Sequence, residues 1–122
     1  MSKDDIYERV MAMDENELDR MVAELAGGFT RGRMSGLWYR DEPGWLQGRL
    51  WSPSRRIEDA WPLWTKLQKP RVVTLYACDD GWHLFVMTSH DKVIDFGILG
   101  PANITRTWVY VKLCERSEQE GA

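Results

Sequence analysis

Cysteine and histidine are scarce in this sequence, and long apolar runs are missing. Two cysteines, Cys78 and Cys114, and two histidines occur among the 122 residues. Their spacing matches none of the common zinc patterns, in which paired ligands lie about two to four residues apart, so we expect no metal and no cofactor. No segment reads as a membrane span or a signal segment. We therefore expect reduced thiols, a cytoplasmic location and no membrane partner.

Recognisable catalytic arrangements are also lacking. A nucleophilic mechanism needs a nucleophile, a base and an orienting group in one place. The one conceivable start is Cys78 with His83, or Cys78 with Asp79 or Asp95. No glycine elbow surrounds Cys78, and no glycine-rich loop leads into the Lys–Ser/Thr pair of a phosphate-binding loop. The adjacent carboxylate pairs fall at predicted helix starts or in a turn, where acids have structural roles. The sequence therefore predicts that the protein is not an enzyme.

The remaining composition is that of an ordinary globular protein, with 43% apolar and 29% charged residues. The length suits one domain with its own core. Helical and strand-like patterns both occur, so we predict a single α+β domain over residues 1–122, with a polar, frayed tail from about residue 117. Its expected architecture is an antiparallel sheet of about four to five short strands layered between helices.

Two helices are predicted near the N-terminus. Ser2 with Asp5 and Asp14 with Glu17 have the spacing of capping boxes. The second of these helices shows apolar residues at helical spacing and ends at Gly27-Gly28.

A third helix is predicted from Ser54, as its cap, to residue 67. Pro62 lies inside the pattern, so the helix is either kinked there or begins anew at the proline. The predicted apolar stripe consists of Ile57, Ala60, Trp61, Trp64 and Leu67.

A β-hairpin is the clearest strand signal. Residues 71–77 and 82–88 flank Asp80-Gly81, a preferred two-residue turn, which would place Cys78 opposite His83 and Tyr76 opposite Phe85. One face of this hairpin is aliphatic and the other is mixed aromatic and polar, and helices could cover both. Residues 92–99 read as a further strand, and a looser hairpin is predicted from strands at 37–39 and 46–51. The closing segment, 103–118, fits either a strand or a helix.

Short motifs resemble a family of small phage and prophage proteins. Glu17-Leu18-Asp19, Val22-Ala23-Glu24 and Gly27-Gly28-Phe29 resemble the opening helix of the phage ABA-sandwich domain, and residues 54–67 resemble its next, serine-capped helix. The resemblance implies a phage origin, a helix–sheet–helix layering and a final helix, and it therefore favours a helix over 103–118. The family has no established activity, so the resemblance implies no catalytic site.

An arginine- and tryptophan-rich middle segment is the unusual feature of the chain. Residues 31–56 contain six arginines and two acids, whereas residues 1–30 contain eight acids and three basic residues. Guanidinium groups bind phosphate and aromatic rings stack on bases, so the segment is a candidate ligand-binding site. An alternative is that its tryptophans enter the core and its arginines pair with the acidic helices. The candidate residues are Arg31, Arg33, Trp38, Tyr39, Arg40, Trp45, Arg49, Trp51, Arg55 and Arg56.

Three binding functions follow from these features. The first is a phage-encoded, homo-oligomeric host-defence antagonist that sequesters a small anionic nucleotide signal. The second is a protein-binding inhibitor of a host defence enzyme that uses the acidic helices. The third, ranked last because the net charge is −3, is a nucleic-acid-binding accessory protein.

Overall fold

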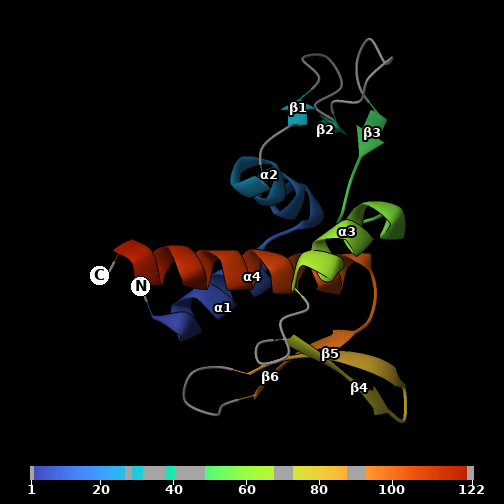
Figure 1. The fold of residues 1–122 in the computed structure, drawn as a ribbon, viewed down its shortest axis with the longest axis vertical. Coiled ribbons are helices and arrows are strands. Elements are labelled where there is room, and N and C mark those ends of the chain that lie inside the picture. The colour runs from blue at the N-terminus through green and yellow to red at the C-terminus, as the bar shows by residue number, and fades with distance from the viewer. Residues whose placement is uncertain are drawn as a thin grey trace.

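The computed structural model describes residues 2–26, 29–31, 38–40, 49–67, 73–87 and 93–120, and their arrangement is drawn in Figure 1. The α+β class is confirmed. The described strands form two separate three-stranded antiparallel sheets, β1–β2–β3 and β4–β5–β6, instead of one sheet of four to five strands. The elements in chain order are α1 (Lys3–Ala12), α2 (Glu15–Ala26), β1 (Phe29–Arg31), β2 (Trp38–Arg40), β3 (Arg49–Trp51), α3 (Ile57–Leu67), β4 (Val73–Cys78), β5 (Gly81–Met87), β6 (Val93–Ile98) and α4 (Pro101–Glu120).

Helix α4 is the centre of the fold. Helices α1, α2 and α3 and the sheet β4–β5–β6 all contact it, and Figure 1 shows this sheet on the opposite side of α4 from α2 and β1–β2–β3. The prediction of a helix here is confirmed, with a start at Pro101, a residue favoured at the first helical position. The frayed tail expected from about residue 117 is wrong, because α4 continues to Glu120.

The burial of α4 explains why its sequence pattern was ambiguous. A helix that is surrounded by other elements lacks an exposed stripe, so it shows no clear helical period. The buried residues of α4 face every direction around its axis: Ile104, Thr105, Thr107, Trp108, Val109, Tyr110, Val111, Leu113 and Cys114.

The N-terminal caps form as predicted. The Asp5 amide donates to Oγ of Ser2 at 3.2 Å, and the Glu17 amide donates to Oδ1 of Asp14 at 2.8 Å. Each bond satisfies an amide that has no partner inside its helix.

Helix α3 differs from its prediction in its start and in its buried face. Ser54 is not the cap, because α3 begins at Ile57 and the Ser54 hydroxyl donates to the carbonyl of Glu15 at 3.2 Å. The helix is continuous through Pro62. Trp61 is 45% exposed and Ile57 is exposed too, so neither belongs to the core. The buried stripe is Ala60, Leu63, Trp64 and Leu67.

The hairpin of β4 and β5 turns one residue earlier than predicted. Cys78 pairs with Gly81 and Tyr76 pairs with His83, so the turn consists of Asp79 and Asp80 and not of Asp80 and Gly81. Gly81 has a φ of +133°, a conformation that glycine adopts readily. The expected pairings of Cys78 with His83 and of Tyr76 with Phe85 are therefore wrong, although the aliphatic face is the one that packs on the core.

Candidate functional site

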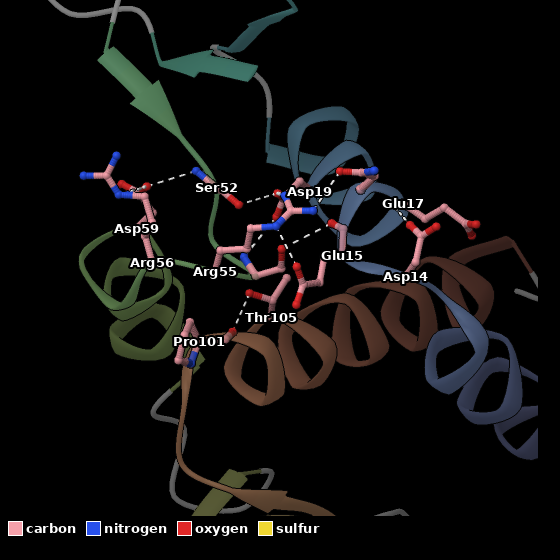
Figure 2. A network of polar contacts seen from close by, with 12 residues as sticks. Asp14, Glu15, Glu17, Asp19, Ser52, Arg55, Arg56, Asp59, Pro101 and Thr105 are labelled. Carbon is pink, nitrogen blue, oxygen red and sulfur yellow. Dashed lines mark hydrogen bonds and ion pairs between the residues drawn. The ribbon is translucent and has the colours of Figure 1, made fainter. Parts of the chain in front are cut away.

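A buried carboxylate joins α2 to the segment between β3 and α3. Asp19 is 3% exposed and accepts hydrogen bonds from the Ser52 hydroxyl at 2.6 Å and from the Ser54 amide at 2.9 Å. Figure 2 shows it at the middle of a polar network between the two segments. A buried charge needs such partners, because water is not available to solvate it.

Arg55 belongs to the same network. Its guanidinium lies 2.6 Å from the Glu15 carboxylate and 3.5 Å from that of Asp19, and it donates to Oδ1 of Asn16 at 3.0 Å. All three partners are on α2, as Figure 2 shows for Glu15 and Asp19. Arg55 therefore pairs with an acidic helix, which is the structural alternative that the charge distribution of the sequence left open.

Arg56, directly before α3, makes a similar set of contacts with acidic residues in the first turn of that helix. It donates twice to Glu58 Oε1, at 2.9 and 2.7 Å, and its Nε lies 3.7 Å from the buried carboxylate of Asp59. The hydrogen bonds that Arg56 donates to Glu58 raise the pKa of Arg56 above its ordinary value. Asp59 also accepts from the Ser52 amide at 3.0 Å. Both Arg55 and Arg56 thus hold the β3–α3 connection in place.

Two of the candidate tryptophans lie at the end of the sheet β1–β2–β3 that packs on the core. Trp38 is the register partner of Trp51 across β2 and β3. Trp51 is buried in the core, and Trp38 is partly buried and packs against it. These two residues attach the small sheet to the body of the protein, so only part of the Trp38 ring is open to a ligand.

The strand register divides the other candidates between two faces of this sheet. Arg40 is opposite Arg49 across β2 and β3, and Arg31 is opposite Trp38 across β1 and β2. Residues opposite one another, and residues two apart along a strand, belong to the same face. Three arginine positions therefore share the face of Trp38 and Trp51, and we call this set the arginine face: Phe29, Arg31, Trp38, Arg40, Arg49 and Trp51.

The remaining candidates do not join this set. Tyr39 is opposite Thr30 and Leu50, so it belongs to the other face of the sheet. Arg33 and Trp45 lie outside the described residues. The eight described residues of the ten that the sequence grouped as one site are thus two structural arginines, five residues on one sheet face and one residue on the reverse of that face.

A second cluster lies on β4–β5–β6, where the sequence indicated His83 and Asp95 only as partners of Cys78 and did not predict the contact with Asp80. His83 Nε2 lies 2.7 Å from Asp80, and Nδ1 lies 3.0 Å from Asp95. The hydrogen bonds with Asp95 and then with Asp80 raise the pKa of His83, because both favour the protonated ring. The i, i+3 spacing of Asp80 and His83 was a signal in the sequence, but the misplaced turn concealed it.

The electrostatics of this cluster oppose nucleophilic chemistry. Desolvation raises the pKa of Cys78, and the carboxylates of Asp80, Asp95 and Asp79 raise it further, so the thiolate is disfavoured. Desolvation also acts to raise the pKa of Asp95, but hydrogen bonds from the Gly97 amide and from His83 outweigh it and lower that pKa.

The two carboxylates approach opposite ring nitrogens of His83 and do not converge on one point. Within the described ranges, no group of three or more His, Cys, Asp and Glu residues is placed to hold a metal ion. None of the helices described here is both long and apolar enough to cross a membrane.

The chain matches no family model, no curated protein and no solved structure. The resemblance to the phage ABA-sandwich family therefore stays a prediction that rests on the short motifs alone.

Proposed function

We propose that the protein is a non-enzymatic binding protein that holds a small anionic ligand, in the first instance a nucleotide, on the arginine face of β1–β2–β3. The observation behind this proposal is the register that sets Arg40 opposite Arg49. Like charges directly opposite one another destabilise an antiparallel pair of strands. An anion bound between two guanidinium groups removes that repulsion and accepts their hydrogen bonds.

The neighbouring register positions support a ligand with both a phosphate and a ring. Arg31 and Trp38 are opposite each other, about 7 Å along the strands from Arg40 and Arg49. A nucleotide has a comparable separation between its charged and aromatic parts, and rings stack on tryptophan and on guanidinium planes. Arg55 and Arg56 are not part of the proposed site, because carboxylates of α2 and α3 already bind them.

The role of host-defence antagonist depends on the resemblance to phage proteins, and we keep it as part of the proposal. It predicts that cyclic and oligomeric nucleotide signals bind more tightly than ordinary mononucleotides. The alternative of an inhibitor that presents its acidic helices is less favoured. Asp14 caps α2, and Glu15 and Asp19 contact Arg55, so part of that charge is already used inside the protein.

Thermal unfolding with a panel of inorganic phosphate, mononucleotides and cyclic nucleotides tests the proposal. A ligand at about 100 times its Kd adds about 2.7 kcal/mol, which is a rise in Tm of about 10 °C for a domain of this size. Flat responses to every compound would overturn it. Binding of long nucleic acids alone, with a steep salt dependence, would assign the arginine face to nucleic acid instead.

Substitution of Arg49 separates a ligand site from a structural role. Arg49→Glu replaces a like-charge pair by an opposite-charge pair, so the free protein should gain about 0.5 kcal/mol while ligand binding weakens at least about tenfold. Tyr39→Ala, on the reverse face, and Arg9→Ala, at an exposed position of α1, are matched controls that should leave binding unchanged. Unchanged binding in Arg49→Glu, or equal losses in the controls, would contradict the assignment.

A further inference from the structure

The sheet β4–β5–β6 has one face against α4 and one face without cover from any described residue. Leu84 and Val86 of β5 are buried toward the core, and Phe96 of β6 is buried with them. The alternate residues form the opposite face, which Figure 1 shows as the side of the sheet turned away from α4. The prediction that helices cover both faces is therefore wrong within the described part of the chain.

The uncovered face, which we call the outer face, exposes several large apolar side chains. Its strands expose Tyr76, Met87, Val93 and Ile98, each with between 47% and 56% of its surface in contact with solvent. The register joins them, since Tyr76 pairs with His83, His83 with Ile98, and Met87 with Val93. Phe85 lies among them in an edge-to-face contact with Tyr76, with ring centroids 5.4 Å apart. Exposed aromatic and methionine side chains in one patch are typical of a protein contact surface.

Its charged groups are almost all acidic. Asp79 and Asp80 in the turn and Asp95 on β6 are exposed, and His83 between two of them is the only basic group of the described hairpin and β6. Among the described residues of this sheet, protonated His83 therefore offsets one carboxylate, and an excess of negative charge remains beside the aromatic residues.

We infer that the outer face docks a basic, amphipathic segment of a partner protein. Apolar side chains of such a segment would cover Tyr76, Phe85 and Met87, and its Lys or Arg residues would meet the carboxylates at the turn. The same charges argue against a second copy of the chain as the occupant. A two-fold contact would set each acidic outer face against its own copy. This surface is separate from the arginine face, so the two proposals stand or fall independently.

Two synthetic peptides test the inference directly. The first is an amphipathic peptide of Leu, Trp and Lys, and the second has the same apolar pattern with Glu in place of Lys. Fluorescence anisotropy of the labelled peptides should show that the basic peptide binds and that its acidic twin binds at least about tenfold more weakly, with the difference reduced at high salt. Equal binding of both peptides, or binding of neither, would overturn the inference.

Variants of the protein locate the binding. Tyr76→Ser with Met87→Ser should weaken binding of the basic peptide about tenfold or more, and Asp79→Asn should weaken it less and lower its salt dependence. Trp61→Ser on α3 is the matched control, because Trp61 is similarly exposed but lies outside the outer face. Circular dichroism confirms that each variant is folded. A concentration-dependent dimer in light scattering that Tyr76→Ser with Met87→Ser abolishes would assign the face to a second copy and overturn the basic partner.

Discussion

The buried carboxylate of Asp19 accepts a 2.6 Å hydrogen bond from the hydroxyl of Ser52. This contact joins α2 to the end of β3, and with it the candidate sheet to the helical body. Asp19 also receives the Ser54 amide and lies beside the Arg55 guanidinium, so one side chain satisfies three groups.

Removal of that carboxylate should destabilise the protein. Asp19→Ala leaves a buried amide and a hydroxyl without their acceptor, and it removes one carboxylate from beside Arg55. We expect these losses together to lower the free energy of unfolding by about 3 kcal/mol. Glu24→Ala is the control, because Glu24 makes an exposed ion pair with Arg20 and should cost less than about 0.5 kcal/mol. Urea unfolding measures both, and equal losses would show that the Asp19 network is not a stabilising one.

The His83 cluster predicts a stability that depends on pH. The contacts with Asp95 and Asp80 raise the pKa of His83 in the folded protein above its unfolded value. The stabilisation is therefore complete below the unfolded pKa, about 6.5, and is lost as the pH rises through the folded pKa. The Tm should fall as the pH rises above the unfolded pKa of about 6.5, and it should fall less in His83→Gln. Cys78→Ser is the control and should keep the wild-type dependence of Tm on pH. If His83→Gln also leaves this dependence unchanged, the His83 cluster does not stabilise the protein.

Pro62 lies within a continuous helix, although proline cannot donate the hydrogen bond that its position in the helix requires. A proline inside a helix lowers the free energy of unfolding by about 3 kcal/mol. By restricting the unfolded chain it raises that free energy by only about 0.4–1 kcal/mol. Because α3 has already adjusted to the proline, Pro62→Ala should stabilise the protein by about 1–2 kcal/mol. Calorimetry measures the rise in Tm, and a fall would indicate that the packing of α3 on α4 depends on the proline.

Gly97 combines a left-handed backbone with a crowded position. Its φ is +97°, and a Cβ added there would lie 2.9 Å from Nδ2 of Asn103, which donates to the Ile98 carbonyl. Gly97→Ala should therefore cost about 1–3 kcal/mol. Gly100→Ala is a suitable control, since its nearest contact would be 3.9 Å away and its φ is not positive. A similar effect of both substitutions on urea unfolding would contradict the steric argument.

Local features of the fold were predictable from the sequence. The caps at Ser2 and Asp14 depend on groups three residues away, and the aliphatic face of the β4–β5 hairpin depends on alternation along two strands. The predicted turn was wrong by one residue because Asp80-Gly81 is the stronger turn signal by itself. In the observed register, β5 also pairs with β6 and His83 contacts Asp95. The Asp80-Gly81 dipeptide alone indicates neither of these interactions.

The sequence by itself determined that this chain is an α+β protein with arginine and tryptophan concentrated in its middle segment. Only the tertiary structure decided what those residues do. It binds Arg55 to Glu15 and Asp19 of a distant helix, places Arg40 opposite Arg49, and leaves one face of β4–β5–β6 uncovered. The physical reason is that an ion pair or a buried surface requires two segments to meet. Composition and periodicity describe each segment alone, so the contacts between segments are decided when the chain folds.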